Sequence, residues 1–322
     1  MKTRDLREWA VDKPRFGSVD DYIAFGRAFL DFRAGGNFQA ELIARNDHKY
    51  QFLQYRDDAG YQLTRPINAE LMYSANAFDD AVALFRDALD SILNGSETTT
   101  AGREALNRVI YTCQQSIGAA LDALPARQSN TARKVNGDLF ERFIGLLILD
   151  CGVDCKSGVI SVPVKDEVGT TLFGMNYQHD LMVEVNGDLK AIGSVKTSSK
   201  DRLDKVFIDK FLYGRLTGTD LPHFAIFLHD VQRAGKEPNY GVSRTFLPGH
   251  FKGYTVKLNP LDGVYYCDLL PNMKTDALLA GHISRIDNLF AENLPTFVAA
   301  PAAVAEVVQE DDIVEATEDY AA

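Results

Sequence analysis

The sequence of 322 residues lacks any apolar run close to the ~18 residues of a membrane span. Its opening residues, MKTRDLREWAVDKPRF, also lack the apolar centre of a secretory signal. We therefore expect a cytoplasmic protein with no membrane partner. The apolar fraction of 46% and the charged fraction of 25% are ordinary for a globular protein, and the length allows one or two domains.

Cysteine is scarce, and two common sequence signatures are missing. The four cysteines form neither a disulfide framework nor a zinc pattern, because the closest two, Cys151 and Cys155, have no second pair or His-x-x-x-His partner. We expect Cys113, Cys151, Cys155 and Cys267 to be reduced thiols. The missing GxxxxGK[ST] loop argues against a nucleotide triphosphate partner, and no GxSxG elbow is present.

Positive charge is in deficit, with a formal net charge of −11. Seven acids lie after residue 300, where no Lys or Arg occurs, so the rest of the chain carries −4. From Lys196 to Arg215 the sign reverses, with six bases against three acids. Overall acidity does not exclude nucleic acid, but it predicts binding in a focused, salt-sensitive cleft.

Residues 177–202 carry the most informative pattern, a β-hairpin around the turn residues 186–188. A three-residue loop gives one largely apolar face, with the pairs Val185–Leu189, Val183–Ala191, Leu181–Gly193 and His179–Val195. On the other face Glu184 lies opposite Lys190, Asp180 lies opposite Ser194, and Lys196 follows one step along. The pattern therefore predicts that Asp180 and Lys196 converge, an arrangement that suits metal-assisted phosphodiester hydrolysis. A solvated hairpin face is the alternative.

Asp180, followed after thirteen residues by Ser194-Val195-Lys196, resembles the PD-(D/E)xK nuclease signature with serine at the second acid position. The continuation through Lys200-Asp201-Arg202 to Asp209 resembles the type II restriction endonucleases that read CC/GG-containing sites, the EcoRII/NgoMIV-like branch. The resemblance implies Mg²⁺, Asp180 as principal metal ligand and Lys196 as catalytic lysine. It further implies that Asp209, on the following helix, supplies the missing acid, with Glu141 on a preceding helix in support. Asp209 and Glu141 are equally compatible with ordinary helix-surface positions.

The resemblance also implies that Lys200-Asp201-Arg202 reads bases. Independently, arginine can bind guanine O6 and N7 together, and aspartate can accept from the cytosine amino group, each discriminating by roughly 1–3 kcal/mol. The alternative is a helix N-terminus with Asp201 as cap or first-turn acid.

Three regions follow from the pattern along the chain. Residues 1–130 are expected to be mainly helical and to serve dimerisation or DNA wrapping, residues 131–294 to be the catalytic core, and residues 295–322 an acidic, disordered tail. We predict helices at 19–33, 77–94, 103–124, 138–150, 202–216 and 276–290. We predict a hairpin of 48–56 with 61–67, and further strands at 158–164, 223–230, 254–258 and 264–269.

The favoured interpretation is an α/β protein, a mixed sheet flanked by helices. Its function would be that of a Mg²⁺-dependent type II site-specific deoxyribonuclease, acting on double-stranded DNA as a homodimer or homotetramer. Two alternatives stay open: another nuclease of this fold in repair or phage DNA processing, and a DNA-binding protein that does not cleave. The dipeptides His179-Asp180 and His229-Asp230 could suggest an HD-type phosphohydrolase, but both lie in strand-like runs where that chemistry expects helices.

Overall fold

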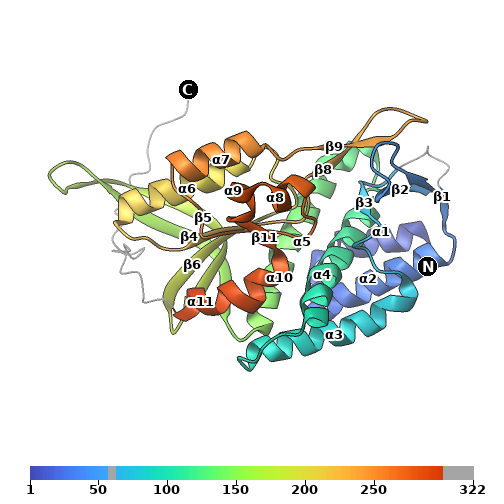
Figure 1. The fold of residues 1–322 in the computed structure, drawn as a ribbon, viewed down its shortest axis with the longest axis horizontal. Helices are drawn as coiled ribbons and strands as arrows, with labels where there is room; N and C mark the ends of the chain where they lie inside the picture. Colours follow the sequence, from blue (N-terminus) through green and yellow to red (C-terminus); the bar gives the residue numbers. More distant parts are fainter. Residues whose placement is uncertain (57–62, 300–322) are drawn as a thin grey trace.

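A computed structural model describes residues 1–56 and 63–299, and its centre is a six-stranded sheet (Figure 1). The strands are β4 (Asp154–Lys165), β5 (Thr171–Val185), β6 (Asp188–Lys196), β7 (His223–Phe227), β10 (Gly263–Tyr266) and β11 (Ile283–Arg285). Their order is β11-β10-β7-β6-β5-β4. β4, β5 and β6 are antiparallel neighbours, whereas β6, β7, β10 and β11 run parallel.

Helices cover both faces of this sheet, as the sequence predicts (Figure 1). Successive residues of β7 show the two faces, since side chains alternate along a strand. Phe224 and Ile226 belong to the core under α5 (Ser129–Asp150), and Ala225 and Phe227 belong to the core under α6 (Leu203–Thr217) and α7 (Pro248–Lys257). The α/β fold class is therefore confirmed.

The N-terminal part supplies helices and a small sheet. The helices are α1 (Thr3–Val11), α2 (Val19–Ala34), α3 (Ala75–Leu93) and α4 (Thr100–Leu121), with a short η1 (Lys13–Arg15). α2, α3 and α4 confirm three predicted helices, and Ser18 and Asp21 form a capping box at the start of α2. Tyr22 of α2 stacks on Phe143 of α5 and donates a hydrogen bond of 2.8 Å to the Leu139 carbonyl. The N-terminal helices and the central sheet thus share one hydrophobic core.

The predicted hairpin of 48–56 with 61–67 is only partly right. β2 (Tyr50–Tyr55) pairs with β1 (Phe38–Ile43), which the sequence pattern missed, and with β3 (Ile67–Asn68). Direct pairing across the expected turn is a single bridge, Gln54–Leu63, and residues 57–62 lie outside the described residues.

α5 begins at Ser129, earlier than the predicted helix start at 138, after the short η2 (Ala126–Gln128). The polar segment before 138 is helical because it buries Ala132, Val135 and Asn136 on one side. The helix therefore runs across the expected region boundary at residue 130.

The hairpin of β5 and β6 has the predicted central register but a different turn. Leu181 pairs with Gly193 and Val183 with Ala191, as predicted. Val185 pairs with Asp188, so the loop has two residues, Asn186 and Gly187, both at positive φ as type I′ turns require. Lys190 is then an extra bulge residue, which leaves Glu184 opposite Leu189. The predicted Val185–Leu189 and Glu184–Lys190 pairs are therefore wrong. The sequence prediction uses a three-residue loop, whereas a two-residue loop followed by a bulge gives the same pairing further along the strands.

The segment 254–258 is predicted as a strand, but residues 254–257 belong to α7 and Leu258 is its C-cap. Its alternating apolar residues fit a strand, but Phe251 and Thr255, four apart, are buried on one side of a helix that begins at Pro248. A two-stranded antiparallel ribbon follows β7 and precedes α7 in the sequence, and it consists of β8 (Val231–Ala234) and β9 (Gly241–Arg244).

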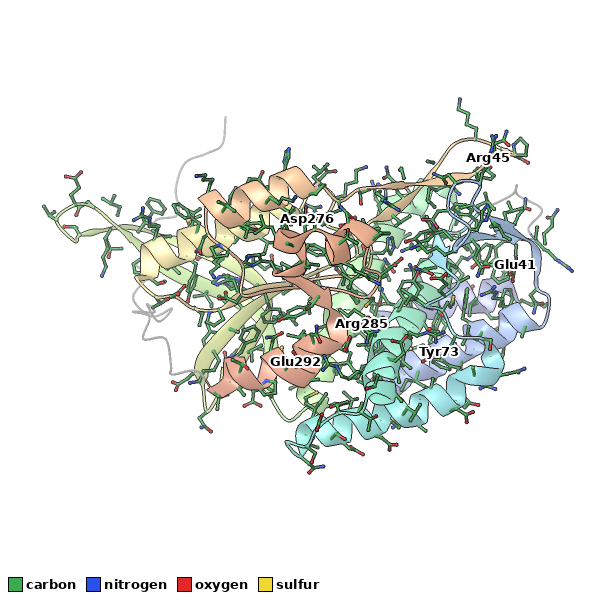
Figure 2. The ribbon with its side chains drawn as sticks, in the orientation of Figure 1. Glu41, Arg45, Tyr73, Asp276, Arg285 and Glu292 are labelled. Carbon is green, nitrogen blue, oxygen red and sulfur yellow. The ribbon has the colours of Figure 1, made fainter. Side chains whose placement is uncertain are left out.

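The predicted helix 276–290 is interrupted. The chain forms α8 (Pro271–Thr275), α9 (Ala277–Ala280), strand β11, α10 (Ile286–Asn288), η3 (Leu289–Asn293) and α11 (Leu294–Ala299). β11 exists because Ile283 pairs in parallel with Val264 at the sheet edge, a tertiary contact. Arg103 of α4 forms ion pairs with Asp287 at 2.8 Å and with Glu292 at 2.5 Å, which connect the α10–η3 segment to the N-terminal helices. Figure 2 labels Glu292 and Arg285 in this C-terminal segment.

The expected tail from residue 295 begins inside α11, where Phe297 stacks on Phe224 of the sheet. The remainder, residues 300–322, lies outside the described residues. Among the described residues, no helix combines the length and apolarity needed to cross a membrane.

A buried carboxylate joins the small sheet to the central one. Asp268, just after β10, accepts hydrogen bonds of 2.9 Å from the Tyr50 hydroxyl and from the Asn68 amide. Burial raises the pKa of Asp268 to about 6, although the hydrogen bonds from Tyr50 and Asn68 oppose that rise. The junction therefore carries a carboxylate whose ionisation the fold disfavours.

This arrangement predicts a pH dependence of stability. Because the folded pKa of Asp268 lies above its unfolded value, its stabilising effect is full below the unfolded pKa and is lost as pH rises through about 6. Asp268→Asn cannot ionise, so wild type should lose about 3 kcal/mol relative to this variant between pH 3.5 and pH 7. Urea unfolding of both proteins at several pH values measures this, and a pH-independent difference would contradict it.

Candidate active site and the turn before α6

Three of the predicted catalytic residues meet at the C-terminal end of β6. Lys196, the last residue of β6, places its Nζ 2.5 Å from Asp180 Oδ2 and 2.8 Å from Glu141 Oε1. Asp180 comes from β5 and Glu141 from α5, so three elements contribute one side chain each. The convergence of Asp180 and Lys196 that the hairpin pattern predicts is confirmed.

A bulge in β5 explains how Asp180 reaches this cluster. Lys156 of β4 pairs with Met182 and Gly158 pairs with His179, so Asp180 and Leu181 together oppose the single residue between them. Tyr177 packs in the core beside α6, yet Leu181 packs in the core beside α5, although the two are an even number of positions apart. The extra residue switches the faces, because strict alternation would keep them on one side.

A backbone donor fixes the carboxylate of Asp180. The Val195 N–H donates to Asp180 Oδ2 at 2.8 Å, and the same oxygen accepts from Lys196. The exposed fractions of the Asp180, Glu141 and Lys196 side chains are 17%, 30% and 32%, so the cluster is open to solvent on one side. A cavity of about 320 Å³, lined in part by Asp180, Glu141 and Ser157, lies beside it.

The charges in this cluster depend on one another. Burial raises the pKa of Glu141, and the negative charge of Asp180 adds to that rise, while Lys196 opposes it. Burial alone lowers the pKa of Lys196, but the charge of Asp180 and the hydrogen bonds to both carboxylates outweigh it and raise the pKa. Lys196 is therefore held as a cation between two acids.

Ser194 and Asp209 lie outside this ion-pair cluster. Ser194 is half-buried on β6, where it pairs with Ala225, and it brings no carboxylate. Asp209 lies on α6 and forms an ion pair of 3.5 Å with Lys205. Burial raises the pKa of Asp209; Lys205 opposes this and Asp180 adds to it. Within residues 1–56 and 63–299, no three His, Cys, Asp or Glu side chains gather closely enough to hold a metal ion by themselves.

Lys200, Asp201 and Arg202 form an exposed turn just before α6. The helix N-cap is Arg202, and Asp201 has a φ of +57°, so Asp201 neither caps the helix nor lies in its first turn. Aspartate is among the few residues that tolerate this left-handed conformation. The Lys200 Nζ donates a hydrogen bond of 3.2 Å to Gln232 Oε1 of β8. The turn borders a cavity of about 470 Å³ that also receives Arg244.

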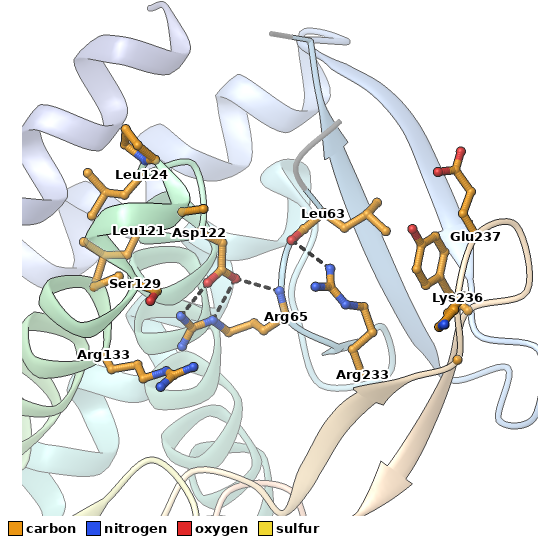
Figure 3. Close-up of a pocket in the computed structure, with 15 residues that line it drawn as sticks. Leu63, Arg65, Leu121, Asp122, Leu124, Ser129, Arg133, Arg233, Lys236 and Glu237 are labelled. Carbon is orange, nitrogen blue, oxygen red and sulfur yellow. Dashed lines mark hydrogen bonds and ion pairs between the residues drawn. The ribbon is translucent and has the colours of Figure 1, made fainter. Parts of the chain in front are cut away.

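A third cavity, of about 750 Å³, lies between the N-terminal end of α5, the end of α4 and the β8–β9 ribbon (Figure 3). In it Arg65 forms a bidentate pair with Asp122, with distances of 2.9 and 2.8 Å. Arg133 and Lys236 add positive charge to its wall. None of the predicted catalytic residues lines this cavity, so it belongs to a different part of the surface.

The HD-type alternative does not fit the structure. His179 lies on β5, buried against Tyr177 and Tyr213, and burial lowers its pKa to about 4. His229 follows β7, and burial lowers its pKa to about 3. Neither His-Asp pair lies on a helix.

The sequence pattern did not single out Gln232 and Arg244 as functional residues. Both lie on the β8–β9 ribbon and line the cavity beside the Lys200–Arg202 turn. They are more than 25 residues beyond that turn in the sequence and belong to no recognisable motif, so only the tertiary structure brings them to it.

Comparison with known proteins finds likeness in structure only. No protein-family model matches this chain, and no curated protein matches it in sequence. Among solved structures, the crystal structure of the Type IIP restriction endonuclease Kpn2I matches with a TM-score of 0.64 at 15% sequence identity, over 92% of this chain and 97% of that one. The chain therefore has the fold of a restriction endonuclease over nearly its whole length.

Proposed function

We propose that this protein is a type II restriction endonuclease that hydrolyses phosphodiester bonds of double-stranded DNA with Mg²⁺. The observation that carries the proposal is the Asp180–Glu141–Lys196 cluster at the C-terminal end of β6 in a restriction-endonuclease fold. Phosphodiester cleavage needs oxygen ligands for a hard cation and a positive charge near the scissile phosphate. This cluster has both.

The residues fit Mg²⁺. Asp180 Oδ2 and Glu141 Oε1 converge on one cation already, the Lys196 ammonium. Mg²⁺ prefers oxygen ligands and commonly uses one or two carboxylates together with substrate phosphate and water, so two protein carboxylates suffice. When bound, Mg²⁺ would stabilise the charge that develops on the phosphate. Asp209 is close enough to Asp180 for their two negative charges to interact, and this interaction is what would link Asp209 to the metal-binding carboxylates.

Lys196 would offset charge on the scissile phosphate and orient the attacking water. Its two carboxylate partners keep it protonated, so it acts as a fixed positive charge rather than as a base in this state. The Val195 N–H holds Asp180 in place, which keeps the distance between acid and lysine constant.

Base reading is proposed for the Lys200–Arg202 turn, at a site containing CC/GG. Its exposed position and its cavity leave Arg202 and Asp201 accessible to a major groove. A palindromic site would be read by two chains related by a two-fold axis, which is why we propose a homodimer or homotetramer. A non-cleaving DNA-binding protein is the second candidate, because Ser194 leaves the usual second acid position empty of charge.

We expect discrete DNA fragments when the purified protein meets sequence-diverse duplex DNA with Mg²⁺, and none without it. Asp180→Ala and Lys196→Ala should each slow cleavage by at least about 10²-fold, because the first removes the proposed principal Mg²⁺ ligand and the second removes the positive charge near the scissile phosphate. Gel analysis of single-turnover reactions measures the rates.

The matched controls are Asp87→Ala and Lys257→Ala, exposed residues on α3 and α7 that should cut like wild type. Sequence-specific binding by wild type without any cutting would favour the non-cleaving protein instead.

The two candidate second acids can be separated. Glu141→Ala should slow cleavage about 10²-fold, because Glu141 touches Lys196, whereas Asp209→Ala should have the smaller effect. Measuring the Mg²⁺ concentration for half-maximal rate in both variants shows which residue contributes to metal affinity. A larger loss in Asp209→Ala than in Glu141→Ala would reverse this assignment.

Arg202→Ala should relax the choice of site, since a bidentate arginine–guanine contact discriminates by roughly 1–3 kcal/mol, or about 5- to 150-fold. Sequencing the ends of the fragments reports the cut sites. Arg215→Ala, at the other end of α6, is the control and should leave site choice intact. Unchanged cut sites in Arg202→Ala would remove this residue from base reading.

A further inference from the structure

We infer that the β8–β9 ribbon forms the second half of the base-reading surface, with Gln232 and Arg244 as specificity-determining residues and Asp230 as the positioning residue that locks ribbon and turn together. The inference rests on the proposed function, because it extends the surface assigned there to the Lys200–Arg202 turn.

Asp230 is the centre of a buried hydrogen-bond network. Its carboxylate is fully shielded from solvent and accepts from the hydroxyl groups of Ser198, Ser199, Thr245 and Tyr266. Ser199 also donates its backbone N–H at 2.8 Å. A buried carboxylate is costly unless its oxygens accept several hydrogen bonds, and here five donors satisfy it.

These donors come from separate parts of the chain. Ser198 and Ser199 immediately precede the Lys200–Arg202 turn, Thr245 immediately follows β9, and Tyr266 ends β10 in the central sheet. Asp230 itself immediately precedes β8. One carboxylate thus connects the start of the turn, the start of β8 and the end of β9 to the central sheet. This satisfied network rigidifies the turn and the ribbon relative to the sheet.

The ribbon presents two side chains suited to bases beside that turn. Gln232 accepts from Lys200 at 3.2 Å, which joins turn and ribbon directly, and Arg244 lines the same cavity of about 470 Å³. Arg244 pairs with Asp47 at 3.9 Å, and the Arg244 side chain is 51% exposed, so this ion pair is weak. The Arg244 guanidinium therefore stays accessible to another acceptor.

The chemistry of these two side chains predicts what they read. A glutamine amide can bind adenine N6 and N7 together, and an arginine can bind guanine O6 and N7. Gln232 and Arg244 would therefore select base pairs in addition to those read by Lys200, Asp201 and Arg202. The recognised site should be longer than the turn alone can specify.

The test is selection of bound duplexes from a randomised DNA library, in the Lys196→Ala background so that bound DNA is not cut. Gln232→Ala and Arg244→Ala should each weaken preference about 5- to 150-fold at base positions different from those that Arg202→Ala relaxes. Arg233→Ala is the matched control, because Arg233 lines the cavity of about 750 Å³ and donates a hydrogen bond to the Leu63 carbonyl. It should keep the wild-type preferences.

Asp230→Asn should weaken preference at both sets of positions at once, with non-specific binding unchanged. Thr245→Val, which removes a single donor, should do the same to a smaller degree at an unchanged melting temperature, and so separates positioning from loss of fold. Wild-type preferences in Gln232→Ala and Arg244→Ala, alongside relaxed preference in Arg202→Ala, would overturn this inference and leave the proposed function standing. Absence of any sequence preference in the Lys196→Ala parent and in wild type would overturn both.

Discussion

The extra residue of β5, where Asp180 and Leu181 together oppose one residue of β4, is the constraint on which the candidate active site depends. Without it, alternation along the strand could not send Tyr177 into the core beside α6 and Leu181 into the core beside α5. The bulge lets the hydrophobic core and the ion-pair cluster use adjacent residues of one strand. Bulges frequently re-aim side chains next to functional sites, and this one brings an acid to a lysine.

α5 connects that cluster to the rest of the molecule. One side of the helix packs Phe140, Phe143 and Leu147 into the core shared with the N-terminal helices, while Glu141 contacts Lys196. The stack of Tyr22 on Phe143 fixes the helix only two residues from Glu141. The N-terminal helices therefore support the geometry of the cluster through packing, although they bring no side chain to it.

The turn before α6 is held by a different device. Its backbone adopts a left-handed conformation at Asp201 and would be poorly defined if only solvent surrounded it. The carboxylate of Asp230 anchors the serines in front of it and the strands beside it, so an exposed, polar surface rests on a fully buried polar centre. Interior hydrogen bonds are strong in such a setting, which gives the surface a fixed shape, and the buried Val231 and Val242 of the ribbon add hydrophobic contacts beneath it.

The α/β fold class and the main N-terminal helices could be predicted from the sequence, because they follow from local periodicity. The pairing of neighbouring strands also predicted that Asp180 meets Lys196, but the β5 bulge that aims Asp180 became visible only in the structure. The sequence could not decide that 254–257 is helical or that Ile283 begins a strand, since the packing of Tyr254 on Phe207 and the pairing with Val264 are long-range contacts. Likewise, only the tertiary structure separated Glu141, which touches Lys196, from Asp209, which pairs with Lys205. Both acids fit the sequence pattern equally well; their helices pack on opposite faces of the sheet, and that packing decides which carboxylate reaches the lysine.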